Sequence, residues 1–167
     1  MKRKVKLVSL LLLVPLALFA DFNLKTNEKL LFGFYTPKGK SLSIAIDTDH
    51  RYVVYRFSKG KKVELQYPKN LTHSFKKFTY FYYMRGGMGN AGEDLNYLRF
   101  QVGKILYVVY DEYASDDDSR YIGIKVRDAK SGKEYADIQG DPKTVKGSLS
   151  DFRDLDVHKD DRTDFGE

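Results

Sequence analysis

Cysteine is absent from this 167-residue chain, and its absence excludes several functions at once. Without thiols the protein has no disulfide, no cysteine nucleophile, no thiolate metal site and no lipid attached to a cysteine. Long apolar runs are also scarce, because no stretch after residue 20 is apolar for long enough to span a bilayer. The fold must then be stabilised by packing, to which 13 tyrosines and 11 phenylalanines contribute.

The first twenty residues have the pattern of a secretory signal. Four cations lie within the first six residues, an almost wholly apolar run extends over residues 5–19, and Ala17 and Ala20 lie at its end. We expect cleavage after Ala20, so that residues 1–20 are removed and the mature chain begins at Asp21. A retained membrane anchor is the alternative, although the run is short for a spanning helix. The sequence thus predicts a periplasmic or secreted protein without stable membrane insertion.

Charge is unevenly distributed along the chain. The formal net charge is +6, and it falls to +2 once the four cations of residues 1–20 are removed. Residues 150–167 hold seven acids and three bases. We therefore expect a single domain over residues 21–152 and an acidic, flexible tail over residues 153–167. No concentrated basic patch is present, so we expect no nucleic-acid partner.

Alternation of apolar and polar residues predicts β-strands throughout the body of the chain. In Lys62–Tyr67, for example, Val63, Leu65 and Tyr67 share one face of the strand. Strands joined by hairpins at this spacing indicate an all-β domain, either an antiparallel sandwich or a small barrel of about 8–10 strands. A short helix is allowed within residues 69–77 or near the C-terminus. The expected strands are Leu30–Thr36, Leu42–Ile46, Arg51–Phe57, Lys62–Tyr67, Phe75–Met84, Leu95–Val102, Lys104–Tyr113, Tyr121–Asp128, Glu134–Ile138 and Val145–Phe152.

A glycine-rich stretch, Gly87–Gly92, fits the G-x-G-x-x-G pattern of dinucleotide sites. Such a site needs a helix N-terminus immediately afterwards, but here Glu93, Asp94 and a further strand follow. We interpret the stretch as a long loop between two strands. Arg85 just before it has the guanidinium geometry to bind a carboxylate or phosphate through two hydrogen bonds.

Metal and catalytic motifs are weak. Asp111, Glu112 and Asp116–Asp118 offer oxygen ligands that suit calcium, but without EF-hand spacing, so a solvated acidic turn is the alternative. No zinc-type histidine spacing and no G-x-S-x-G motif occur. We expect no cofactor and no enzymatic activity, with a hydrolase assembled from scattered Asp, His and Ser as the remaining alternative. The histidines are His50, His73 and His158.

The segment Phe78–Tyr83 has aromatic side chains on both faces of the expected strand, because every residue except Thr79 is Phe or Tyr. If one face of this strand lies outside the core, Tyr80 and Tyr82 with the nearby Arg85 would bind a sugar, a peptide or a protein partner. The alternative is that both faces are covered.

The segment Ser131-Gly132-Lys133-Glu134-Tyr135 resembles the Ser-Gly-x-x-Tyr motif of bacterial periplasmic and membrane-bound lysozyme inhibitors. Those are small exported β-barrel proteins that insert a loop into the lysozyme active-site cleft. The resemblance implies that Ser131 and Tyr135 contact the enzyme and that Lys133 meets a catalytic carboxylate. The lack of cysteine departs from members that carry a lipid anchor or a disulfide. An ordinary hairpin is the alternative, because Ser-Gly is common in turns.

These observations favour an exported binding protein over an enzyme. The most specific hypothesis is a proteinaceous inhibitor of a cell-wall hydrolase, lysozyme-like, that acts by loop insertion. The alternatives are an immunity protein against a secreted toxin and an envelope module that binds glycan or peptide.

Overall fold

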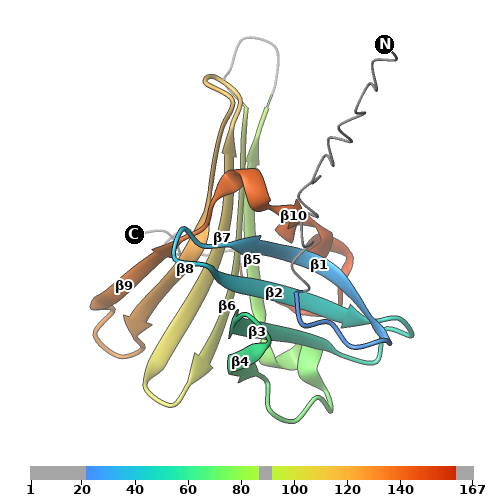
Figure 1. Ribbon diagram of the computed structural model, residues 1–167. Coiled ribbons are helices and arrows are strands. Elements are labelled where there is room, and N and C mark those ends of the chain that lie inside the picture. The colour runs from blue at the N-terminus through green and yellow to red at the C-terminus, as the bar shows by residue number, and fades with distance from the viewer. Residues whose placement is uncertain (1–21, 87–91, 161–167) are drawn as a thin grey trace, which may run out of the picture.

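The protein is a β-sandwich of two sheets, seen here in a computed structural model that describes residues 22–86 and 92–160 (Figure 1). The first sheet has the spatial order β10-β1-β2-β3-β4 and the second has the order β11-β5-β6-β7-β8-β9. All paired neighbours are antiparallel except β11 and β5, which are parallel. The sheets do not close into a barrel, so the predicted all-β sandwich is confirmed and the barrel alternative is not.

The five-stranded sheet consists of β1 (Glu28–Tyr35), β2 (Lys40–Asp47), β3 (Val53–Lys59), β4 (Lys62–Tyr67) and β10 (Lys146–Gly147). The six-stranded sheet consists of β5 (Thr79–Arg85), β6 (Glu93–Val102), β7 (Ile105–Ala114), β8 (Ser119–Asp128), β9 (Glu134–Gln139) and β11 (His158–Lys159). Three short 3₁₀ helices join them within the described ranges: η1 (Ser74–Lys77), η2 (Pro142–Thr144) and η3 (Leu149–Asp154).

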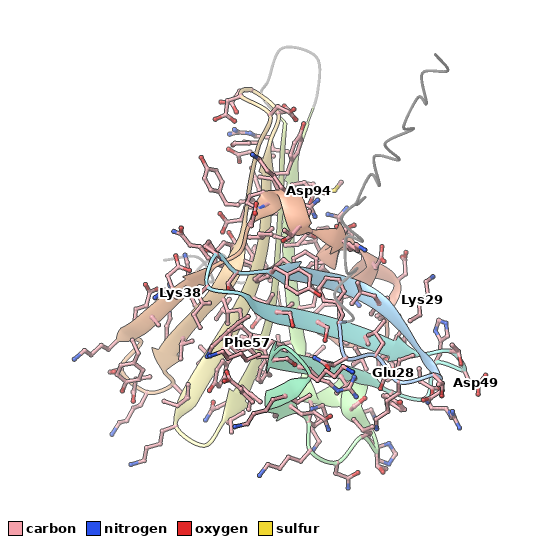
Figure 2. The ribbon with its side chains drawn as sticks, in the orientation of Figure 1. Glu28, Lys29, Lys38, Asp49, Phe57 and Asp94 are labelled. Atoms are coloured by element: carbon pink, nitrogen blue, oxygen red, sulfur yellow. The ribbon has the colours of Figure 1, made fainter. Side chains whose placement is uncertain are left out.

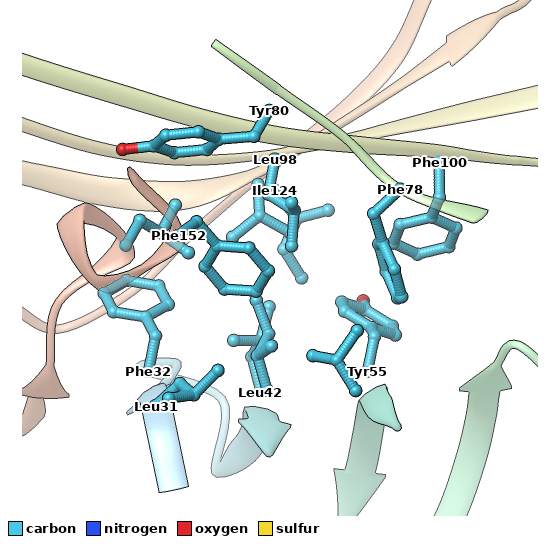
Figure 3. Packing of buried hydrophobic residues seen from close by; sticks show 14 of the residues in the cluster. Leu31, Phe32, Leu42, Tyr55, Phe78, Tyr80, Leu98, Phe100, Ile124 and Phe152 are labelled. Atoms are coloured by element: carbon cyan, nitrogen blue, oxygen red, sulfur yellow. The ribbon is translucent and has the colours of Figure 1, made fainter. Parts of the chain in front are cut away.

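Aromatic rings join the two sheets into one core (Figure 3). The Phe100 ring of β6 stacks on Tyr67 of β4 at 4.4 Å between centroids, and it lies 4.7 Å from Tyr55 of β3. Phe100 also stacks on Tyr107 of β7 at 5.0 Å between centroids. Offset and tilted rings at these distances attract one another beyond the burial of their area. Alternation along each strand places these residues on the inner faces, as the sequence predicts.

Two predicted strands need correction. Phe75–Met84 begins as a strand only at Thr79, because residues 74–77 form η1, where the buried Ser74 hydroxyl accepts the Val53 N–H at 2.8 Å. The predicted strand Val145–Phe152 is β10 followed by η3. The main chain at Gly147 lies so close to Leu31 of β1 that a Cβ would meet the Leu31 carbonyl oxygen. The chain then turns into a 3₁₀ helix, as the sequence allowed near the C-terminus.

The ordered domain continues past the boundary expected at residue 152. Residue 152 lies inside η3, and Val157 is buried in the shared core. β11 then pairs with β5, and Asp160 forms an ion pair with Arg99 at 2.7 Å. The domain therefore extends at least to Asp160. The rest of the predicted acidic tail, and the predicted signal over residues 1–20, lie outside the described residues.

The segment that leads into β1 covers the outer face of the five-stranded sheet. Phe22 packs on Gly33, where a side chain would collide with its ring. Beneath the segment, the buried Arg56 guanidinium donates to both Glu28 carboxylate oxygens at 2.6 and 2.8 Å, and to the Asn23 carbonyl at 3.4 Å. Burial alone would raise the pKa of the Glu28 carboxyl, but the hydrogen bonds from Arg56 and the Lys25 N–H hold it below its usual value.

The Arg56–Glu28 pair gives a stability prediction. Arg56→Leu leaves a buried carboxylate without its partner and should lower the free energy of unfolding by about 3–5 kcal/mol. The double variant Glu28→Gln with Arg56→Leu should lose much less free energy of unfolding than Arg56→Leu alone, because no unpaired charge stays buried. Because the pKa of Glu28 is lowered in the folded state, the difference in free energy of unfolding between wild type and Arg56→Leu should narrow as the pH falls below 4.5. Urea titrations at several pH values measure this, and equal losses in the single and double variants would contradict it.

Candidate functional site

The tip of the β8–β9 hairpin, residues 128–135, carries the segment that resembles the inhibitor motif. Two backbone hydrogen bonds close the loop: Gly132 N–H donates to the Asp128 carbonyl at 2.9 Å, and Asp128 N–H donates to the Lys133 carbonyl at 2.8 Å. Gly132 has a φ of +72°, which favours glycine, and a Cβ there would meet no atom within 4 Å. The backbone conformation, and not a lack of space, therefore explains the glycine of the motif.

The Asp128 side chain organises this tip. Its Oδ1 accepts from the Lys130 N–H at 3.0 Å, the Ser131 N–H at 2.8 Å and the Ser131 hydroxyl at 2.9 Å. Its Oδ2 accepts the Tyr135 hydroxyl at 3.1 Å. Aspartate favours turns because its side chain can bond the backbone in this way. The bonds from Ser131 N–H, the Ser131 hydroxyl and Lys130 N–H hold the pKa of the Asp128 carboxyl below its ordinary value.

The same hydrogen bonds give two motif residues a structural role within the loop. Ser131 and Tyr135, which the resemblance assigns to the partner contact, each donate the hydroxyl hydrogen to Asp128. Both side chains thus hold the loop in place. The Tyr135 ring still presents a surface, since the residue is 54% exposed.

The tip carries two cationic side chains, Lys130 and Lys133. Lys130 and Lys133 are exposed, and neither ammonium group has a hydrogen bond or ion pair with any residue within 22–86 and 92–160. The loop itself is tied to the neighbouring β6–β7 turn, because Ala129 N–H donates to the Lys104 carbonyl at 2.9 Å. The tip therefore presents two positive charges on a well-held backbone.

Asp128 is the site residue that sequence reasoning missed. The signal was present: an aspartate three residues before Ser-Gly at a hairpin end is typical of a turn closed by a side chain. Asp128 lies outside the Ser-Gly-x-x-Tyr motif, which begins at Ser131.

The aromatic strand β5 changes its exposure along its length instead of from face to face. Tyr80 is fully buried, and its hydroxyl donates to Asn96 Oδ1 at 2.5 Å. This corrects the expectation that Tyr80 binds a partner. Tyr82 is 45% exposed, as are Tyr83 at 41% and Met84 at 57%, because this end of β5 extends past the five-stranded sheet (Figure 1).

A shallow groove follows this end of β5. Its volume is about 570 Å³, and it is lined by Tyr80–Met84 with Lys159 and Asp160. One face of the Tyr82 ring is occupied, since the Arg153 guanidinium lies 4.9 Å from its centroid. Arg85 forms an exposed ion pair with Glu93 at 2.9 Å. Most of the predicted glycine-rich loop, residues 87–91, lies outside the described residues.

The predicted acidic cluster is divided by the fold. Asp111 lies on β7, is buried, and accepts two hydrogen bonds from Arg120 at 2.7 and 2.9 Å. Asp117 lies in the β7–β8 turn and accepts the Ser119 N–H at 3.0 Å. No group of three His, Cys, Asp or Glu side chains that could hold a metal ion occurs in the described ranges. A calcium interpretation therefore has no support in that part of the chain.

Two further findings bear on function. In the described part of the chain, none of the helices has the length and apolar character needed to cross a membrane. Comparison with protein-family models, curated proteins and solved structures finds no match to this chain. The likeness to lysozyme inhibitors thus rests on Ser131–Tyr135.

The hairpin tip yields a prediction about protonation. NMR titration should place the pKa of Asp128 below 3.8, and Ser131→Ala should raise it towards 3.8 because one donor is lost. The contribution of ionised Asp128 to the stability of the folded protein is present above pH 3.8 and is lost as the pH falls through the folded pKa of Asp128. Asp117, whose pKa is also lowered but by Ser119, serves as an internal control that should not change. An unaltered Asp128 pKa in Ser131→Ala would show that Asp128 does not organise the tip.

Proposed function

We propose that this chain is an exported protein inhibitor of a cell-wall muramidase, which it blocks by inserting the β8–β9 hairpin tip into the active-site cleft. The observation that carries the proposal is an exposed, hydrogen-bonded tip with two ammonium groups that have no partner among residues 22–86 and 92–160. Glycosidases of this class carry a pair of catalytic carboxylates in the cleft. A lysine on an inserted loop can form a charge-assisted hydrogen bond with one of them.

Preorganisation supports a loop-insertion mechanism. A loop that must be ordered on binding loses affinity, whereas one already fixed in the free protein does not. Asp128 accepts four hydrogen bonds within the tip, and Ala129 ties it to the β6–β7 turn. In this proposal Ser131 and Tyr135 fix the loop, and Lys133 reaches the carboxylate. The mechanism needs no cofactor and no covalent chemistry.

The alternatives differ in the target and in the surface that is used. An immunity protein against a secreted toxin would use the same tip on another enzyme. An envelope module for glycan or peptide would use the groove along β5, where Tyr82 and Tyr83 are exposed. Muramidase titration separates these functions, because only the proposed muramidase inhibitor predicts a stoichiometric loss of muramidase activity.

Lys133 gives the sharpest test of the proposal. Lys133→Glu places a carboxylate against a catalytic carboxylate and should weaken inhibition by about 2–5 kcal/mol, which is roughly 30-fold to 4,000-fold in the inhibition constant. Lys143→Glu, on the exposed helix η2, changes the net charge equally and should leave inhibition unchanged. The measurement is residual activity of a panel of muramidases titrated with each variant. Equal effects of both variants would assign inhibition to overall charge, and no inhibition by wild type would reject the proposal.

Export has its own test. The full-length protein, expressed in a bacterium, should be recovered from the periplasm or medium with Asp21 as its first residue, as read by intact mass and N-terminal sequencing. A chain that keeps residues 1–20 and sediments with membranes would instead support a retained anchor.

A further inference from the structure

The outer edge of β9 is unpaired among residues 22–86 and 92–160. β9 is the last strand of its sheet, and its only partner in the described part of the chain is β8. Gly140 N–H donates to the Ile122 carbonyl at 2.9 Å, which sets the alternation of the antiparallel ladder. Asp137 and Gln139 therefore lie in non-hydrogen-bonded pairs with β8. Their backbone N–H and C=O groups point away from β8. Such an edge can pair with another extended chain.

An apolar groove lies along this edge, where the sandwich is left open. Its volume is about 450 Å³, and Pro37, Phe57, Ala136 and Ile138 supply its apolar walls. Pro37 lies in the β1–β2 turn and Phe57 is on β3, so one wall comes from the five-stranded sheet and the other from β9. A strand added to β9 would place every second side chain in this groove, because side chains alternate between faces.

Lysines stand at the same end of the five-stranded sheet, where Figure 2 labels Lys38 and Phe57. The Lys40 ammonium lies 5.3 Å from the centroid of the Phe57 ring and bonds Glu64 at 2.7 Å. Lys38 is exposed and lines the groove, and it forms no ion pair with any residue within 22–86 and 92–160. The groove thus combines an apolar floor, a main-chain edge and an available cation.

We propose that this edge is a second binding site, which takes an extended segment of a partner protein as an added strand beside β9. The main chain of that segment pairs with Asp137 and Gln139. Its inward side chains are apolar and cover Phe57 and Ile138, and an acidic residue pairs with Lys38. This mode of peptide recognition takes affinity from the main chain and specificity from the alternate side chains.

A second copy of this chain fits the edge less well. When residues 135–139 of two copies pair antiparallel over their whole length, the two-fold axis passes between the two Asp137 residues. Each Asp137 then lies directly opposite its own counterpart, and like charges in that position are destabilising. Other registers pair fewer residues. The other end of the sheet differs too, because β11 already occupies the edge of β5 at Thr79 and Tyr80.

The test uses a phage-displayed library of random nine-residue peptides, selected on the purified protein. Enriched peptides should alternate apolar residues and carry an acid. In NMR spectra of the protein, these peptides should shift the amide resonances of residues 134–139 and of Lys38. Fluorescein-labelled forms of the same peptides measure the binding affinity. Asp137→Pro removes an outward N–H that β8 does not use, which an edge strand tolerates. It should weaken peptide binding at least about tenfold, whereas the matched control Asp137→Ala should stay within about twofold.

Either of the following results would overturn the proposal. The first is the absence of enriched alternating peptides, or peptides that bind Asp137→Pro as tightly as wild type. The second is self-association of the protein in sedimentation that disappears in Asp137→Pro, which would assign the edge to a second copy. The readout is peptide binding and not muramidase activity, and Lys133→Glu should leave it unchanged. Failure here is therefore distinguishable from failure of the proposed inhibitor function.

Discussion

The two sheets share one core but run across each other, and this constraint decides which parts of the molecule are covered. Rings from β3 and β4 of one sheet meet Phe78 and Phe100 at the other, so that packing is dense where the sheets overlap. β6, β7 and β8 are ten residues long, and their ends pass beyond that overlap. The exposed end of β5 and the β8–β9 tip lie outside this overlap, and the edge of β9 lies at its margin, where the two sheets form the walls of a groove.

The hairpin tip shows how a loop outside the core is kept in one conformation. The core contributes little there, since residues 129–135 are exposed. The Asp128 carboxylate holds the loop instead of core packing. It accepts hydrogen bonds from backbone N–H and hydroxyl groups of Lys130, Ser131 and Tyr135. The ammonium groups of Lys130 and Lys133 have no partner in the described part of the chain, so that a hydrogen-bonded backbone and available charge occur together. A loop that blocks an enzyme cleft needs both.

Sequence reasoning recovered the strands and missed what depends on distant contacts. Lys62–Tyr67 was predicted with the observed bounds because alternation is a local property. Tyr80 was expected to be accessible, since alternation assigns a residue to a face but does not say how far the opposite sheet extends. Val145–Phe152 failed for a related reason: the close approach of Gly147 to Leu31 turns the chain away from an extended path. Nor does a sequence reveal strand order, on which the open edge of β9 depends.

The most direct test of insertion is competition for the muramidase cleft. A chitooligosaccharide that occupies the cleft would be titrated into a complex of the muramidase with this protein, and release of the protein followed by sedimentation or calorimetry. Insertion of the tip predicts mutually exclusive binding, with the apparent affinity of the protein falling in proportion to the occupied fraction of the cleft. A ternary complex of enzyme, oligosaccharide and protein would contradict it.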